Sequence, residues 1–175
     1  MFSWAGNRIT FLMLGLFGGL LAGLSLSQSV VFFMPISLAL LWAVNNSPLA
    51  SFLWGVGALI VSHSWLLALH PLGWIGVPDL LSWPFTIAIW LFCGVFAGGL
   101  VSFWSWLGLR FFNQDLVHSS LKTQFFYALA MSSAWGFGEV CLSHWPLFWI
   151  GIGETLLPGD LWLAGLARWI GSGGL

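Results

Sequence analysis

Apolar stretches separated by short polar or Pro/Gly-rich breaks follow one another along the whole chain. The stretches cover residues 9–26, 30–44, 49–69, 84–109, 124–143 and 161–175. A helix needs about 20 mostly apolar residues to cross the hydrocarbon core of a bilayer. The pattern therefore predicts an all-α fold, a polytopic transmembrane helix bundle with about five full spans and a truncated sixth.

Turn-forming or polar sequence marks the connections between these stretches. Asn45-Asn46-Ser47-Pro48 is typical of a turn, and residues 70–83 are rich in Pro and Gly. Residues 110–122 are the most polar part of the chain, whereas 144–160 are aromatic and too broken for a spanning helix. We expect residues 1–175 to form a single transmembrane domain, an apparent fragment of a longer protein.

The first stretch allows a second interpretation, a cleaved signal peptide. Arg8 followed by the apolar residues 9–26 resembles the charged and apolar regions of such a leader. The apolar part is long for a leader, however, and no Ala-x-Ala cleavage site follows it. A retained first helix is therefore favoured.

Glycines recur at four-residue spacing in two of the predicted helices. They are Gly15, Gly19 and Gly23 in the first, and Gly94 and Gly98 in the fourth. This spacing puts small residues along one stripe of a helix, which lets transmembrane helices approach closely. We expect these five glycines to serve helix packing.

Composition supports the membrane assignment. Hydrophobic residues make up 59% of the chain and charged residues only 5%, whereas a soluble domain carries roughly 25% charged residues. A water-facing surface cannot be built from so few charges. The net charge of −1 leaves no basic patch for nucleic acid, so no nucleic-acid partner is expected.

The few charges also predict an orientation. If the helices alternate in direction, three basic residues fall on one face of the membrane and three acidic residues on the other. The basic residues are Arg8, Arg110 and Lys122, and the acidic residues are Asp79, Glu154 and Asp160. Basic residues in short loops mark the cytoplasmic side. The N-terminus is therefore predicted to be cytoplasmic, although Asp115 departs from the pattern.

Glu139 is the main candidate for chemistry, because it lies inside the fifth apolar stretch. A charge in the hydrocarbon region costs about 2.5–3.5 kcal/mol on insertion scales, so such residues are usually functional. Substrate or lipid contact is one interpretation. The alternative is a structural carboxyl group near the outer end of its helix, hydrogen-bonded to another helix.

Arg168 and Trp149 are further candidates for lipid contact. Arg168 lies in the last apolar stretch, where it can extend to the headgroups or bind an anionic lipid phosphate. Trp149 follows the fifth stretch, and its amphipathic ring suits the headgroup region. The alternative for Trp149 is a simple interfacial anchor.

No residue pattern predicts a catalytic group, a metal site or a cofactor. Cys93 and Cys141 lack metal-binding or redox spacing, and no HExxH or nucleophile-elbow motif occurs. The sequence does not place His63 or His144 on the same helical face as Glu139. Ser172, among glycines, is better explained as part of a helix start than as a nucleophile.

Several Trp- and Gly-containing motifs resemble the N-terminal membrane domain of bacterial apolipoprotein N-acyltransferases. The motifs are Trp54-Gly55-Val56-Gly57 with Trp65, Ala134-Trp135-Gly136-Phe137-Gly138-Glu139, Trp149-Ile150-Gly151-Ile152-Gly153, and Gly165-Leu166-Ala167 with Gly171. Their order and spacing extend over nearly the whole chain. The chain departs from the family where Leu142-Ser143 replace a common Arg-Gly, and where Ser27-Gln28-Ser29 replace a Pro-containing loop.

The resemblance implies transfer of a fatty acyl chain from a phospholipid to the N-terminal cysteine amine of a lipoprotein. The implied location is the outer face of the bacterial cytoplasmic (inner) membrane. In the family a nitrilase-like domain with a Glu-Lys-Cys triad performs this lipoprotein-maturation chemistry, and the chain stops before that domain. We therefore expect the chain alone to be inactive, with a separately encoded nitrilase-like domain as one candidate partner.

Two other interpretations stay open at this point. The chain could be a small non-enzymatic membrane protein, either transporter-like or an assembly module, although no convincing internal repeat supports a transporter. It could also be the remnant of a decayed gene. A downstream reading frame that encodes Glu, Lys and Cys in a nitrilase-like segment would favour a split enzyme.

Overall fold

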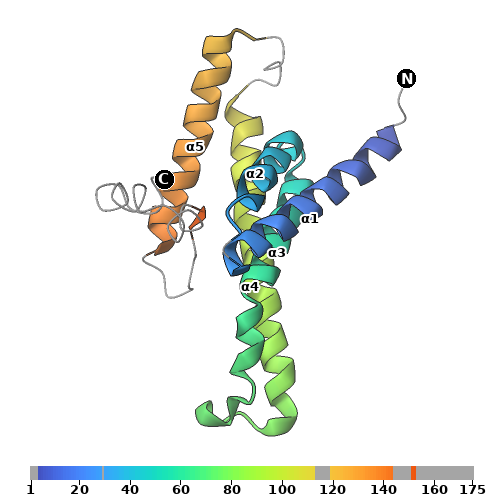
Figure 1. Ribbon diagram of the computed structural model, residues 1–175, viewed down its shortest axis with the longest axis vertical. Coiled ribbons are helices and arrows are strands. Elements are labelled where there is room, and N and C mark those ends of the chain that lie inside the picture. Colours follow the sequence, from blue (N-terminus) through green and yellow to red (C-terminus); the bar gives the residue numbers. More distant parts are fainter. Residues whose placement is uncertain (1–3, 29, 113–118, 144–150, 153–175) are drawn as a thin grey trace.

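The structure is a computed structural model that describes residues 4–28, 30–112, 119–143 and 151–152 (Figure 1). These residues form α-helices and short 3-10 helices, and no strand occurs among them. The elements are α1 (Trp4–Gln28), α2 (Phe33–Val44), α3 (Pro48–Ser62), η1 (Ser64–Leu69), η2 (Leu72–Ile75), α4 (Asp79–Phe111) and α5 (Leu121–Ser143). The predicted all-α fold is confirmed.

Three of the described helices are long and apolar enough to cross a membrane. They are α1 from Arg8, α4 with 33 residues, and α5 up to Leu142. Helices α2 and α3 are shorter, with 12 and 15 residues. The helical membrane bundle is therefore confirmed, but fewer described helices reach spanning length than the five that we expected.

The third predicted stretch, 49–69, is not one continuous helix. Helix α3 ends at Ser62, and the chain turns at His63 (φ −101°, ψ 19°) into the 3-10 helix η1. The Ser62 hydroxyl is within hydrogen-bonding distance of Leu59 O (3.4 Å) and His63 Nδ1 (2.9 Å). Such local side-chain bonds compete with the regular helix, which gives a physical reason for the break.

Helix α4 begins earlier than its apolar pattern indicates. We expected it to start at Pro84, but it starts at Asp79, and Pro84 lies inside the helix. The Ser82 hydroxyl accepts a hydrogen bond from the Leu72 N–H (2.8 Å) and contacts His70 Nδ1 (2.7 Å). These bonds hold the preceding loop against the first turn of α4, so part of the predicted loop is helical.

Glycines line the contact between α1 and α3. A Cβ atom at Gly15 or Gly19 would collide with the carbonyl oxygen of Ala50 or Trp54, respectively, and one at Gly23 would lie 2.6 Å from a carbonyl oxygen of α3. The backbones of the two helices thus approach to a distance that only glycine allows at these positions. The close approach matches the small-residue packing of transmembrane helices.

The contact between α3 and α4 uses the second glycine pair. A Cβ atom at Gly98 would lie 2.8 Å from the carbonyl oxygen of Phe52, and one at Gly94 would lie 3.0 Å from the side chain of Ile60. Helix α3 is therefore enclosed between α1 and α4 (Figure 1). It forms the centre of the bundle even though it is short.

Buried hydroxyl and amide groups connect the helices. Ser37 on α2 donates a hydrogen bond to Gly18 O on α1 (2.6 Å) and accepts one from Trp54 Nε1 on α3 (3.0 Å). At the other end of α2, Asn45 Nδ2 donates to the hydroxyl of Tyr127 on α5 (2.8 Å). These bonds connect α2 and its C-terminal end to α1, α3 and α5, and each satisfies polar groups that lipid cannot.

Candidate functional site

A cavity of about 600 Å³ lies between α4 and α5. Its walls are mainly apolar and come from residues 96–107 of α4 and 134–142 of α5. The two helices meet where Trp104 Nε1 donates a hydrogen bond to Met131 O (2.9 Å). This contact brings the cavity-lining part of α4 beside the part of α5 that carries Glu139.

Glu139 borders the cavity and is only 6% exposed. Its Oε1 atom accepts a hydrogen bond from Trp135 Nε1 and another from the backbone N–H of Ile152, both at 2.8 Å. The first donor lies one helical turn before Glu139, a spacing that places two side chains on one face of a helix. The second donor lies beyond the end of α5, so the carboxyl group ties the following chain back to the helix.

The indole that binds Glu139 also lies at the centre of the bundle. Its ring packs edge-to-face against Trp104 of α4 (5.4 Å, 88°) and Trp54 of α3 (6.0 Å, 84°). Edge-to-face packing is a favourable geometry for aromatic pairs. Trp135 therefore links the carboxyl group of Glu139 to three helices at once.

His63 lies close to the same group of residues. It is 5% exposed, and it borders a second, small cavity of about 30 Å³ together with Trp135 and Ile152. Both of these residues also bind Glu139. The fold thus brings His63 of the α3–η1 junction and Glu139 of α5 into one neighbourhood, although the sequence did not place them together.

The remaining predicted residues divide into two groups. Gly15, Gly19, Gly23, Gly94 and Gly98 lie at helix contacts away from the larger cavity. Trp149 and Arg168 lie outside the described residues, as do Glu154, Asp160 and Ser172.

The two cysteines lie on different helices of the described part of the chain. Cys141 lies on the cavity wall and is exposed, whereas Cys93 is half-buried on α4; neither is in a disulfide. Within the described residues, no group of three or more His, Cys, Asp or Glu side chains could hold a metal ion.

The sequence did not reveal the role of the tryptophans. Trp104 is 6% exposed and lies inside the bundle, where its indole N–H donates a hydrogen bond to a backbone carbonyl on α5. The four-residue separation of Trp135 and Glu139 was the available signal for their contact.

Curated proteins related to the chain carry a single name. An apolipoprotein N-acyltransferase of Prochlorococcus marinus (strain MIT 9313) is 49% identical over 169 residues, which are 97% of this chain and 34% of the relative. One from a second strain of Prochlorococcus marinus is 50% identical over 175 residues, 100% of this chain and 35% of the relative. One from Parasynechococcus marenigrum (strain WH8102) is 44% identical over 164 residues, 94% and 34% respectively.

Comparisons with family models and with solved structures found no match to the chain. The chain spans about a third of the length of the curated relatives that it matches. Over this shared third, the chain belongs to the apolipoprotein N-acyltransferase family.

Proposed function

We propose that the chain is the membrane part of an apolipoprotein N-acyltransferase, a system that moves an acyl chain from a phospholipid to the N-terminal cysteine amine of a lipoprotein. The single observation that carries this proposal is the 50% identity to one such protein over the whole chain. The apolar helices of the structure support it, because both the proposed donor and the proposed product are membrane-bound.

The proposed role of the chain is to anchor the system and to supply a surface that lipid can reach. The acyl transfer itself is assigned to a nitrilase-like part, either in one chain with these helices or separately encoded. This division accords with the chemistry of the described residues. Cys93 and Cys141 both lie on helices of spanning length. Neither cysteine lies in a motif that resembles the one around the family's nucleophile. We propose that these helices alone do not transfer an acyl chain.

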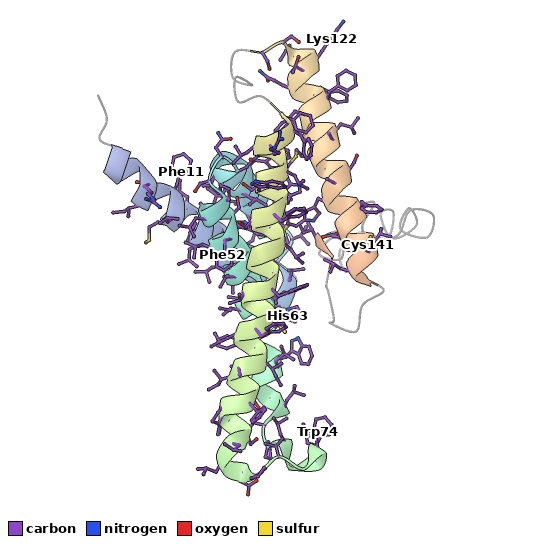
Figure 2. All side chains as sticks on the ribbon, turned by 180° about the vertical axis from the view of Figure 1, so that it is seen from behind. Phe11, Phe52, His63, Trp74, Lys122 and Cys141 are labelled. Atoms are coloured by element: carbon purple, nitrogen blue, oxygen red, sulfur yellow. The ribbon has the colours of Figure 1, made fainter. Side chains whose placement is uncertain are left out.

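We propose that the protein lies in the bacterial inner membrane with its N-terminus in the cytoplasm. Helix α4 supports this orientation, since Asp79 is in its first turn and Arg110 in its last. Figure 2 shows Lys122 and Trp74 at opposite ends of the molecule. Lys122 is the second residue of α5, the helix that follows Arg110, so these two basic residues lie at one end of α4 and α5. Arg168 and Trp149 keep their proposed role in lipid contact.

A chimeric enzyme tests the proposal. The chain would replace the matched third of the relative from Prochlorococcus marinus (strain MIT 9313). Membranes that contain the chimera would be incubated with a phospholipid and a diacylated lipopeptide, and the lipopeptide mass would be measured. We expect a product heavier by one acyl chain.

Two controls make the result decisive. The unmodified relative must be active under the same conditions, and the chain by itself should give no product. A chimera that is inserted and thermally as stable as the relative, yet inactive, would contradict the proposal. Product from the chain alone, abolished by Cys93→Ala or Cys141→Ala, would contradict the proposed division of labour.

A further inference from the structure

We propose that the apolar hairpin at one end of the molecule is a docking surface for the soluble acyl-transfer part of the system. The hairpin consists of η1, η2 and residues 79–89, the beginning of α4. Figure 1 shows it extending beyond α1 and α2, and in Figure 2 it carries Trp74 at the end opposite Lys122. The identity of the partner rests on the proposed function, whereas the need for a partner follows from the hairpin itself.

Helix α4 is longer than the hydrocarbon core of a bilayer. Its 33 residues extend about 50 Å, whereas the core is about 30 Å thick. A tilt of about 20°, the average for transmembrane helices, still leaves roughly 17 Å of the helix outside the core. Arg110 lies in the last turn of α4, and a charged side chain favours the edge of the core. The core then ends about 20 residues before Arg110, and residues 79–89 lie beyond it on the proposed outer side.

The part of α4 beyond the core presents an apolar surface. Every exposed side chain from residue 80 to residue 89 is apolar. The large ones, each at least 40% exposed, are Leu80, Leu81, Trp83, Phe85, Ile87 and Ile89. Ser82 and Thr86 are buried, so no polar side chain interrupts this surface between residues 80 and 89.

The 3-10 helices enlarge the apolar surface of the hairpin. Trp65, Trp74 and Ile75 are 44%, 72% and 55% exposed, respectively. Asp79 is the one Asp, Glu, Lys or Arg residue between residues 64 and 89. The hairpin therefore presents several large aromatic and aliphatic side chains together with a single carboxylate.

Neither water nor the membrane surface covers such a hairpin well. Large exposed apolar patches on soluble surfaces are usually interaction sites. A helix that lies on a membrane has a strongly polar face beside its apolar face, whereas Asp79 is the only exposed polar side chain among residues 79–89. A helix that is apolar on most sides is buried by protein where lipid does not surround it. The cover is therefore another protein surface.

The acyl-transfer part of the system is the partner on the correct side. The Asp79 end of α4 is the proposed outer end, and the resemblance to the family implies acyl transfer at the outer face. The curated relatives contain enough chain for such a partner, because this chain matches only about a third of each. We expect the partner to present an apolar patch with few charges, since burial of an unpaired charge is costly.

Photo-crosslinking identifies the partner. The chimera of this chain with the rest of the relative from Prochlorococcus marinus (strain MIT 9313) would carry benzoylphenylalanine in place of Trp74. The same probe in place of Phe111 is the matched control, because Phe111 is similarly exposed (70%, against 72%) and lies at the inner end of α4. Membranes would be irradiated, and linked peptides would be identified by mass spectrometry. We expect links to the soluble acyl-transfer part from position 74 and none from position 111.

Leu80→Asn tests the apolar contact. Loss of one buried leucine side chain from an interface weakens docking about tenfold, so the link yield at position 74 should fall by about that factor. Leu121→Asn is the matched control, because Leu121 is also exposed (83%, against 88% for Leu80) but begins α5 at the inner end. It should change the yield by less than about twofold. Since both leucines are exposed in the chain itself, neither variant should lower the thermal midpoint of the chain alone.

Two results would overturn the proposal. The first is a link from position 74 to lipid or to a second copy of the chimera in place of the acyl-transfer part. The second is an equal link yield at position 74 in the Leu80→Asn and Leu121→Asn variants. Acyl transfer is measured separately in the same membranes. An active chimera without the link would contradict docking alone, and a linked but inactive chimera would contradict the proposed function alone.

Discussion

Glu139 shows how a single carboxyl group is accommodated in an apolar helix. The sequence identified it as an outlier, because insertion of a charge into hydrocarbon is costly. The structure adds two donors, one from Trp135 in the preceding turn and one from Ile152. The contact with Trp135 could be predicted from helical spacing alone. The contact with Ile152 could not, because it depends on how the chain returns after α5.

Two substitutions of Glu139 distinguish the contribution of its hydrogen-bond acceptor from the contribution of its charge. Glu139→Ala leaves the Trp135 and Ile152 N–H groups without their acceptor, and each unsatisfied buried donor costs about 1–3 kcal/mol. We expect Glu139→Ala to lower the free energy of unfolding by about 3 kcal/mol and Glu139→Gln, which keeps an acceptor oxygen, by about 1 kcal/mol. Denaturant titration of the detergent-solubilised protein measures both. Equal effects of the two variants would show that the hydrogen bonds do not explain the burial.

At the scale of helices, the glycine spacing predicted close packing but not the partner. Gly15 and Gly19 of α1 face α3, and Gly98 of α4 faces the same helix from the other side. Spacing identifies a stripe of small residues, but pairing between helices depends on the three-dimensional arrangement. The break after Ser62 was missed for a related reason, since apolar periodicity continues through the change from α-helix to 3-10 helix.

Gly19→Ala tests the close contact between α1 and α3. The added methyl group would collide with the Trp54 carbonyl oxygen, so the helices must move apart. Overpacking of this kind costs about 1–3 kcal/mol. Gly99→Ala is the matched control, because open space surrounds that position, and a change of no more than about 0.5 kcal/mol is expected. Thermal unfolding in detergent compares the two variants, and indistinguishable midpoints would contradict the described packing.

Ser37→Ala tests how α2 is held between its neighbours. The variant loses the hydrogen bond to Gly18 O and the one from Trp54 Nε1 to the Ser37 hydroxyl, whereas Trp54 Nε1 keeps a contact with the backbone Ser37 O at 3.2 Å. We expect a loss of about 1 kcal/mol in the free energy of unfolding. Ser27→Ala, an exposed serine on α1, should change stability by less than about 0.5 kcal/mol. If Ser27→Ala were the more harmful change, the buried hydroxyl would not stabilise the bundle.

At the scale of the whole molecule, the distribution of charge predicts which ends face the cytoplasm. In a variant with Cys93→Ala and Cys141→Ala, a cysteine at Lys122 should react with a membrane-impermeant maleimide only after the cells are opened. A cysteine at Trp74, which is 72% exposed, should react in intact cells. The physical reason is the preference of basic residues for the cytoplasmic side. The reverse labelling pattern would invert the proposed orientation.

The membrane fold and the family were both predictable from the sequence, for different reasons. The scarcity of charge in long apolar stretches is enough to require lipid-facing helices. The arrangement around Trp135 was not predictable, because Trp54, Trp104 and Glu139 come from three helices that are distant in the chain. Their contacts depend on tertiary packing, which hydrophobic periodicity does not encode.

The proposed role of the chain is tested most directly by the mass of a lipoprotein made in cells. Bacteria would carry, as their sole apolipoprotein N-acyltransferase, the chimera in which this chain replaces the matched third of the Prochlorococcus marinus (strain MIT 9313) relative. The N-terminal peptide of a lipoprotein from these cells would be weighed by mass spectrometry. We expect an acylated cysteine amine. A peptide that retains a free amine, in cells where the chimera is present in the membrane and folded, would contradict it.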